Sequence, residues 1–304
     1  MSKRSIAIIC GFFVALFYAY NFTAAKEVTP EFIGPFGLTW YRVVVTCAIF
    51  WLISLFAGVK EKIPLREFPL IALAAFCGVG FNMVTFMWGL SLTSPISASV
   101  LMVSTPIIVL VLSAIFLKER LFATRIIGIL VGFSGAALLI FLSTGKGAEA
   151  SNPLLGNALI FINAVSYAFY ILLAKKLTAK YHVFTLMKWL YFFGVIFITP
   201  FGIMQGLEFE FAQASTETLL NIGYVILFAT FGTYMLNIIA IRTLKPSVVA
   251  VFVYLQPLLA TLIAVGLGKD MITWQKAVAG LLIFTGVFLT GLKRNKKQLP
   301  YKQN

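Results

Sequence analysis

Residues 68–117 read FPLIALAAFCGVGFNMVTFMWGLSLTSPISASVLMVSTPIIVLVLSAIFL, a run of 50 positions without a charged side chain. As one helix this run would extend about 75 Å at about 1.5 Å per residue, whereas the hydrocarbon core of a bilayer is about 30 Å thick. The run therefore predicts two membrane-spanning helices. The turn between them is expected at Thr93-Ser94-Pro95, where small polar residues and a proline interrupt the apolar sequence.

The composition of the whole chain excludes the water-soluble classes. Of 304 residues, 61% are hydrophobic and 11% are charged, whereas soluble domains carry about 45–50% apolar and about 25% charged residues. The net charge of +14 does not indicate nucleic-acid binding, because the basic residues lie in short loops between apolar runs. That distribution is typical of multi-pass membrane proteins.

Eight further apolar stretches bring the predicted number of transmembrane helices to ten. Leu, Ile, Val and Phe occur on all sides of each stretch, which is expected for helices embedded in lipid. The predicted fold class is therefore an all-α integral membrane protein. A cleaved signal peptide is the alternative for the first stretch, but that stretch exceeds the usual ~7–15 apolar residues of a signal core. The eight stretches are Ser5–Ala25, Gly34–Ala57, Ile126–Leu142, Leu154–Ala174, Thr185–Met204, Thr218–Ile241, Pro246–Leu267 and Trp274–Leu292.

The distribution of Lys and Arg over the loops predicts the orientation of the chain. Eighteen of these residues fall on one set of alternate loops and tails, and four fall on the other set. Cytoplasmic loops of membrane proteins carry the excess of Lys and Arg. Both termini are therefore predicted to be cytoplasmic, which requires an even number of spans.

An internal repeat relates the two halves of the chain. A shift of 151 residues aligns prolines that are followed at equal spacing by a lysine and an acidic residue, and a shift of 149 aligns aromatic residues near the start of each half. The predicted units are residues 1–145 and 150–295, with five helices each, followed by a basic tail at 296–304. The aligned pairs are Pro95 with Pro246, Pro106 with Pro257, Glu119 with Asp270, Tyr18 with Tyr167, and Trp40 with Trp189.

Because five is odd, the second half is expected to enter the membrane from the opposite face. Inverted repeats are typical of secondary transporters, in which the binding site lies at mid-depth between the halves. The sequence therefore predicts a carrier with a central cavity.

The chain resembles the EamA-type family of the drug/metabolite transporter superfamily over nearly its whole length. The resemblance rests on Trp40-Tyr41-Arg42 and on a motif that occurs once in each half, although the second copy carries Asp270 where the family usually shows Glu. It implies ten helices, of which the first four of each half surround a cavity and the fifth and tenth brace the periphery. It also implies a bacterial inner-membrane carrier that moves amino acids, other metabolites or toxic compounds, commonly outward. The motif residues are Pro106, Phe116-Leu117-Lys118-Glu119-Arg120, Gly128 and Gly135, then Pro257, Gly268-Lys269-Asp270, Gly280 and Gly286.

Arg42 is the strongest candidate for a functional residue. A cationic side chain inside a span costs about 2.5–3.5 kcal/mol on insertion scales, so it needs a reason to be there. One interpretation is that it faces the cavity and binds a substrate carboxylate through its planar guanidinium. The other is that its long side chain reaches the outer headgroups or bonds the carbonyls at a helix end.

Polar residues near the centres of other spans are further candidates for substrate binding. An unpaired amide in hydrocarbon costs several kcal/mol, so these side chains are expected to face protein or water. Hydrogen bonding between helices is the alternative role. Two pairs correspond under the shift of 151, namely Asn82 with Thr233 and Thr105 with Gln256. The candidates are Asn82, Thr105, Asn163, Thr233 and Gln256.

Tyrosines and prolines complete the predicted site. Tyr18, Tyr167 and Tyr254 are expected to line an amphipathic cavity, where a ring stacks on organic substrates and a hydroxyl bonds them. Pro106 and Pro257 each remove one backbone donor and are candidate hinges, although passive kinks are equally compatible with the sequence. Glycines at 128, 132 and 135 predict close helix packing.

The residues that are missing from the spans also constrain function. No acidic residue lies within a predicted span, so we expect a facilitator or exchanger, or coupling through Glu27 or Glu31 at a span edge. Three cysteines and the single His182 do not make a metal-ligand pattern, and no cofactor is expected. The chain contains none of the hydrolase or metalloprotease motifs, so it is not predicted to be an enzyme.

Several alternatives to a metabolite carrier stay open. These are a nucleotide-sugar or organic-phosphate exchanger of the same superfamily, and a channel or scaffold that transports nothing. The expected partners are the lipid bilayer and a small-molecule substrate, with no nucleic acid; a homodimer is also compatible with the sequence.

Overall fold

The computed structural model describes residues 2–28, 32–56, 58, 61–93, 101–118, 122–142, 152–266 and 273–291. Over these ranges the chain is helical and contains no β-strand. The predicted all-α membrane class is therefore confirmed, while the number of spans is a finer question.

Six helical stretches among the described residues are long and apolar enough to cross a bilayer. Two of them combine several elements. The stretch Leu65–Leu92 contains η1 (Leu65–Glu67), α3 (Phe68–Ala75), the π-helical segment η2 (Phe76–Gly80) and α4 (Phe81–Leu92), and Thr216–Thr243 contains α10 (Thr216–Ile226), the π-helical segment η3 (Leu227–Gly232) and α11 (Thr233–Thr243). The other four are α1 (Lys3–Val28), α2 (Pro35–Phe56), α8 (Pro153–Thr178) and α9 (Val183–Leu207).

Four apolar helical stretches with shorter described parts lie where the remaining spans are predicted. The predicted break after residue 92 is confirmed, because α4 ends at Leu92 and Thr93 is extended; Ser94 and Pro95 lie outside the described residues, and the next described residues, from Leu101, are helical. The four stretches contain α6 (Thr105–Phe116), α7 (Ala123–Leu142), α12 with η4 and α13 (Pro246–Val251, Phe252–Tyr254 and Leu255–Gly266), and α14 (Trp274–Gly291).

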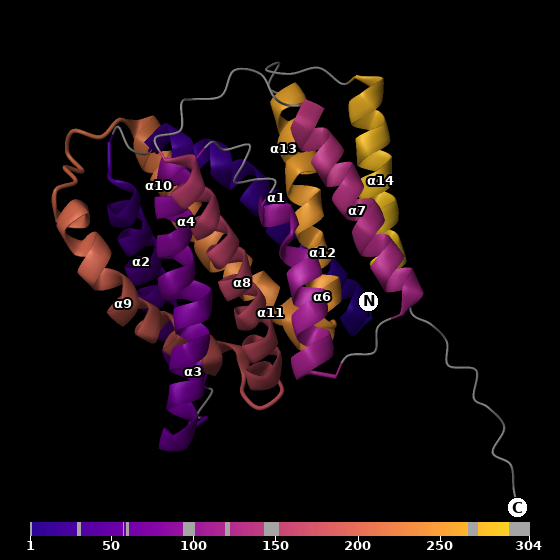
Figure 1. The fold of residues 1–304 in the computed structure, drawn as a ribbon. Coiled ribbons are helices and arrows are strands. Elements are labelled where there is room, and N and C mark those ends of the chain that lie inside the picture. Colours follow the sequence, from indigo (N-terminus) through magenta and orange to yellow (C-terminus); the bar gives the residue numbers. More distant parts are fainter. Residues whose placement is uncertain are drawn as a thin grey trace, which may run out of the picture.

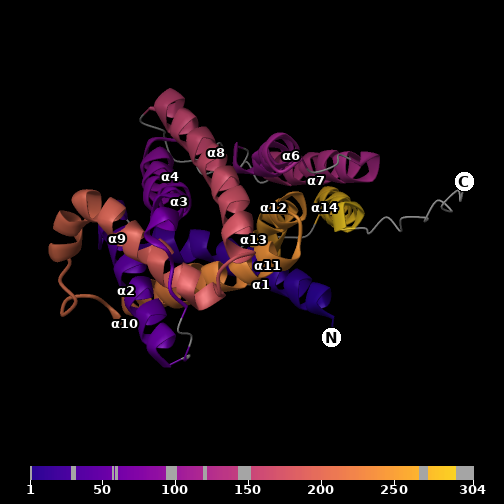
Figure 2. The same cartoon turned by 90° about the horizontal axis from the view of Figure 1, so that it is seen from below.

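Helices from one half of the chain pack against helices from the other half. The most extensive contacts join α7 to α14 and α2 to α9, followed by α4 to α8 and α1 to α11. Figure 2 shows α7 and α14 together at one edge of the molecule, beside α12 and α13, whereas α2 and α9 lie toward the opposite edge. The remaining long helices lie between these two pairs (Figures 1 and 2).

Glycines make the α7–α14 contact possible, as the sequence predicted. A Cβ atom added to Gly286 would lie 2.5 Å from the Cα of Gly132, and one added to Gly135 would lie 2.8 Å from the carbonyl oxygen of Ala279. The two backbones therefore touch directly, which is the usual role of small residues between membrane helices.

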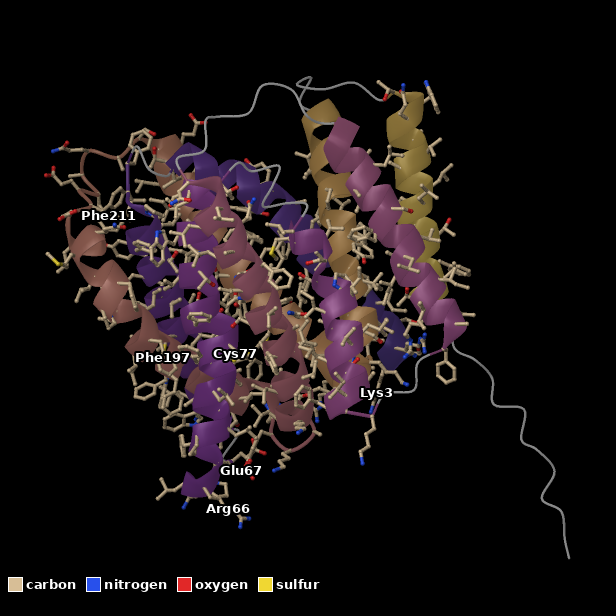
Figure 3. The ribbon with its side chains drawn as sticks, in the orientation of Figure 1. Lys3, Arg66, Glu67, Cys77, Phe197 and Phe211 are labelled. Atoms are coloured by element: carbon tan, nitrogen blue, oxygen red, sulfur yellow. The ribbon has the colours of Figure 1, made fainter. Side chains whose placement is uncertain are left out.

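Charged side chains lie at both ends of the bundle. Figure 3 shows Lys3, Arg66 and Glu67 at the lower end, and Phe211 at the upper end. At the lower end Lys180 forms an ion pair with Glu67 at 2.8 Å, and the backbone N–H of His182 donates to Glu61 at 2.8 Å. These contacts join the segment before α3 to the turn between α8 and α9.

Candidate substrate-binding cavity

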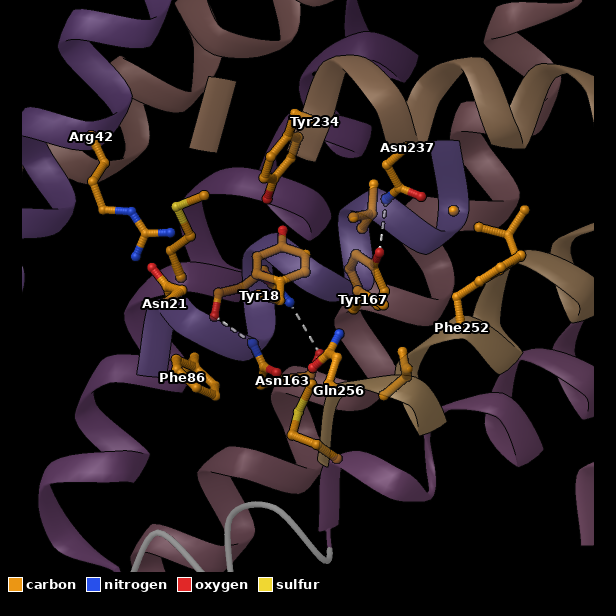
Figure 4. A pocket seen from close by; sticks show the side chains of 18 of the residues that line it. Tyr18, Asn21, Arg42, Phe86, Asn163, Tyr167, Tyr234, Asn237, Phe252 and Gln256 are labelled. Carbon is orange, nitrogen blue, oxygen red and sulfur yellow. Dashed lines mark hydrogen bonds between the residues drawn. The ribbon is translucent and has the colours of Figure 1, made fainter. Parts of the chain in front are cut away.

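A cavity lies between the two halves of the chain and is lined by side chains from α1, α2, α4, α8, α11, the α12–α13 region and Met102 (Figure 4). The centre of a water molecule can occupy about 110 Å³ inside the cavity. A sphere of that volume, widened by the roughly 1.4 Å radius of water, encloses roughly 350 Å³, near the lower end of the about 300–1,000 Å³ range of ligand pockets. The cavity is therefore large enough for a small organic molecule.

Arg42 faces this cavity and does not reach the surface. It lies seven residues into α2, or about 10 Å along the helix at ~1.5 Å per residue, and only 7% of it is exposed. Its Nε donates to the Thr230 hydroxyl at 2.8 Å. The two Nη nitrogens have no hydrogen-bond partner, and no carboxylate pairs with them, among the described residues. Of the two interpretations of Arg42, the structure favours the one in which it faces the cavity.

Two pairs of polar side chains in the wall bond one another or the neighbouring backbone. The Nδ2 of Asn82 donates to the carbonyl of Asn163 at 3.2 Å, and the Nδ2 of Asn163 donates to the carbonyl of Asn82 at 2.6 Å, which ties α4 to α8. The Nδ2 of Asn237 donates to the hydroxyl of Tyr167 at 2.8 Å, which ties α11 to α8. These groups are at once structural bonds between helices and part of the polar lining.

Other polar groups in the lining are unpaired. The Oδ1 of Asn21 is buried without a hydrogen-bond partner, although the residue is 8% exposed and borders the cavity. The Gln256 amide also borders the cavity and makes no hydrogen bond to the described residues. Figure 4 shows Arg42 and Asn21 toward one end of the cavity and Phe252 toward the other. Unpaired buried polar groups are rare, and here a ligand or water can satisfy them.

The rest of the wall is apolar and adaptable. Met83 and Met87 lie one helical turn apart on α4, and Met102 and Phe86 extend the same lining, with Phe252 from the second half. Methionine side chains are flexible and polarizable, so they adjust to the shape of different apolar groups. The cavity thus combines one cationic side chain with a polar and apolar lining.

Six of the nine residues predicted to bind substrate line the cavity, and three do not. Tyr18, Arg42, Asn82, Asn163, Tyr167 and Gln256 are brought together by five helical regions. The other three are buried between helices. The Thr105 hydroxyl has no partner, the Thr233 hydroxyl donates to the backbone of its own helix at Ala229, and Tyr254 packs against Gly132.

The two candidate hinge prolines follow irregular helical turns. Pro106 comes directly after the turn at Ser104 that precedes α6, and Pro257 lies three residues after the short 3-10 segment Phe252–Tyr254. Glu31 and the side chain of Glu27, the candidate carboxyl groups for coupling transport to an ion, lie outside the described residues. Lys269 and Asp270 also lie outside them.

Asn21 and Asn237 are lining residues that the sequence analysis missed. Each lies three residues after a lining tyrosine on its helix, Tyr18 and Tyr234 respectively. Residues three apart share a helix face, so the tyrosines carried a signal that would have found both asparagines.

A comparison with known protein families decides the identity of the chain. Residues 5–141 and 154–292 each match the EamA-like transporter family. The chain belongs to this family. The EamA resemblance that Trp40-Tyr41-Arg42 and the repeated motif indicated is therefore confirmed, and the two matched segments fall one in each half of the sequence.

Curated relatives of this EamA protein carry transporter names without a stated substrate. An uncharacterized transporter of Archaeoglobus fulgidus is 24% identical over 92% of this chain and 96% of its own length. The uncharacterized transporter YetK of Bacillus subtilis is 23% identical over 76% of this chain and 70% of its own. The uncharacterized inner membrane transporter YedA of Escherichia coli is 28% identical over 75% of this chain and 71% of its own.

A solved structure shares the fold of this EamA protein. A crystal structure aligns with a TM-score of 0.77 over 94% of this chain and 97% of the other, at 19% sequence identity. This likeness shows the fold alone, whereas the family match and the transporter names of the relatives make this chain a membrane transporter of the EamA type.

Proposed function

We propose that this protein is a secondary carrier for a small organic molecule that bears a carboxylate, such as an amino acid or a related metabolite. The observation that carries the proposal is the buried guanidinium of Arg42, which faces the cavity with both Nη nitrogens unpaired among the described residues. Two parallel charge-assisted hydrogen bonds to a carboxylate would satisfy both nitrogens. The apolar side chains of the cavity wall would contact the rest of the molecule.

The carrier is proposed to work by alternating access between two inverted five-helix repeats. Two features support this architecture. The closest helix pairs, α2 with α9 and α7 with α14, join the second predicted span of each half and the fifth of each half. In addition, the π-helical segments begin at Phe76 and Leu227, which are 151 residues apart and so correspond under the repeat.

The proposed location is the bacterial inner membrane, with both termini in the cytoplasm and transport directed outward. The excess of Lys and Arg on one set of loops supports this orientation, and YedA is named an inner membrane transporter. Chemical labelling of cysteines introduced at both tails tests the orientation, because tails labelled from different faces would contradict an even number of spans.

Transport is tested in two steps with the full chain. Growth-resistance tests over amino acids and aromatic amines in cells that express the protein identify the substrate and its direction. Counterflow in proteoliposomes then separates a carrier from a channel, because only a carrier gives saturable exchange of labelled for unlabelled compound. Flux that never saturates would replace the carrier with a channel, and selectivity for amines over carboxylates would overturn the role given to Arg42.

A further inference from the structure

The two π-helical segments are connected to the cavity through hydrogen bonds. They lie inside the long stretches Leu65–Leu92 and Thr216–Thr243, at Phe76–Gly80 and Leu227–Gly232. A π-helical turn disturbs the regular backbone hydrogen bonds, and inside a membrane such a disturbance is tolerated only where protein or a cavity satisfies the backbone groups. The identity of the groups that satisfy them is therefore informative.

The second segment is tied to Arg42. Thr230 lies within it and is fully buried. Its hydroxyl donates to the carbonyl of Val225, five residues earlier, at 2.7 Å, and accepts the Nε–H of Arg42 at 2.8 Å. Because a hydroxyl has a single proton, this arrangement fixes Thr230 as the acceptor for Arg42. It also holds the guanidinium so that the Nη nitrogens are left for a ligand.

The first segment is tied to a cavity residue of the other half. The hydroxyl of Tyr234 donates to the carbonyl of Gly78, inside the segment, and the hydroxyl of Ser166 donates to the neighbouring carbonyl of Cys77 at 2.9 Å. Tyr234 lines the cavity and lies two residues after the end of the second segment. At Gly78 a Cβ atom would lie 2.6 Å from Cγ of Tyr170, so the close approach requires glycine.

We propose that Thr230 and Tyr234 are positioning residues that couple occupancy of the cavity to bending of two long spans at their π-helical segments. A ligand that draws Arg42 toward itself acts on the second segment through Thr230. A ligand that displaces the Tyr234 ring acts on the first segment through Gly78. Tyr234 lies two residues after the second segment and donates a hydrogen bond to the first. The two segments therefore respond together, as paired hinges do. The role of this coupling in transport rests on the proposed function, whereas the connection between the two π-helical segments does not.

Hydrogen–deuterium exchange of the full-length protein in lipid nanodiscs, without any ligand, tests the connection. Thr230→Val and Tyr234→Phe are each expected to accelerate amide exchange about fivefold, the change that loss of roughly one hydrogen bond gives. The acceleration should occur in both segments, 76–80 and 227–232, although Thr230 lies outside the first segment and Tyr234 lies outside both. Tyr234→Phe removes a single oxygen atom, so it keeps the test available if Thr230→Val does not fold.

Two matched substitutions serve as controls. Thr85→Val removes a buried hydroxyl that, like Thr230, donates to a carbonyl of its own helix, but that receives no arginine. Tyr191→Phe removes a buried tyrosine hydroxyl that has no hydrogen-bond partner. Thr85→Val should leave amide exchange in segment 227–232 unchanged, and Tyr191→Phe should leave it unchanged in both segments. If Thr230→Val resembles Thr85→Val and Tyr234→Phe resembles Tyr191→Phe, the coupling is wrong.

Counterflow in proteoliposomes with labelled L-phenylalanine as the probe separates this inference from the proposed function. Thr230→Val and Tyr234→Phe are expected to lower the maximal exchange rate at least tenfold while the half-saturating concentration changes less than threefold, and Thr230→Ser should restore the rate. Equal losses in the controls would overturn the inference and leave the carrier intact. If the wild type does not exchange L-phenylalanine, the carrier proposal fails for that probe, and deuterium exchange alone decides the coupling.

Discussion

Replacing Arg42 with glutamine should abolish recognition of a carboxylate without destabilising the fold. Arg42 is 7% exposed, makes one hydrogen bond through Nε, and has no carboxylate partner among the described residues. Removing a charge from such a site recovers a desolvation penalty of several kcal/mol, whereas the lost bond to Thr230 is worth about 1.5–3 kcal/mol. The expected net change in the free energy of unfolding is therefore near zero or slightly stabilising.

The expected loss in substrate affinity is much larger. Both Nη nitrogens can bond a carboxylate, and each charge-assisted bond contributes about 1.5–3 kcal/mol. Losing two such bonds weakens binding by about 3–6 kcal/mol, which is roughly 10²–10⁴-fold. Glutamine can replace one of them with a neutral bond worth about 0.5–1.5 kcal/mol, so a loss of at least about 10-fold is expected.

Two measurements on the same preparations check this prediction. Thermal unfolding in detergent reports stability, and the concentration dependence of counterflow reports affinity for whichever carboxylate the resistance screen identifies. Arg66→Gln is the matched control, because Arg66 is an exposed arginine at one end of the bundle (Figure 3). Unchanged half-saturation in Arg42→Gln would refute carboxylate recognition. A loss of more than about 3 kcal/mol of stability would make Arg42 a structural residue.

Three further substitutions test the contacts around the site. Asn163→Leu should lower stability by about 1–3 kcal/mol in thermal unfolding, since it removes the Nδ2 group that donates to the backbone carbonyl of Asn82; an unchanged melting temperature would mean that this bond does not join α4 to α8. Lys175→Met should cost about 1–3 kcal/mol, because its Nζ donates to the carbonyls of Ile241, Arg242 and Leu244 at the end of α11, and Lys175→Arg should retain part of that stability. Gly286→Val should separate α7 from α14, which accelerated deuterium exchange confined to these two helices would show.

The spans of this protein could be predicted because hydrocarbon imposes a simple requirement on sequence. A helix that crosses a bilayer needs an uninterrupted apolar stretch, so the uncharged run at 68–117 and its break after Leu92 are visible without coordinates. The glycines of the α7–α14 contact were predictable for a related reason, because close backbone approach leaves few other residues possible.

The lining of the cavity was only partly predictable, because the repeat fixes depth but not the direction of a side chain around its helix. Asn82 and Thr233 correspond under the shift of 151, yet only Asn82 lines the cavity. The short Thr233 hydroxyl reaches a carbonyl of its own helix at 2.8 Å, so it needs no external partner. The longer amide of Asn82 instead bonds across to α8.

The positions of the π-helical segments could not be predicted from the sequence. Their hydrogen bonds to Arg42 and Tyr234 join residues 188 and 156 positions apart. Contacts at such separation exist only once the helices have packed, so neither hydropathy nor helix propensity indicates them. The prolines, which do leave a signal, lie beside other irregular turns instead.

The polar groups of the cavity fall into two sets with different consequences. The pairs Asn82–Asn163 and Tyr167–Asn237 satisfy one another, so they hold helix faces together whether or not a ligand is present. The Nη nitrogens of Arg42 and the Oδ1 of Asn21 have no such partner among the described residues. A ligand therefore gains affinity if it brings an anionic group to Arg42 and a donor to Asn21. A molecule that offers both, with an apolar remainder for the methionines, matches this wall better than a purely cationic or purely apolar one.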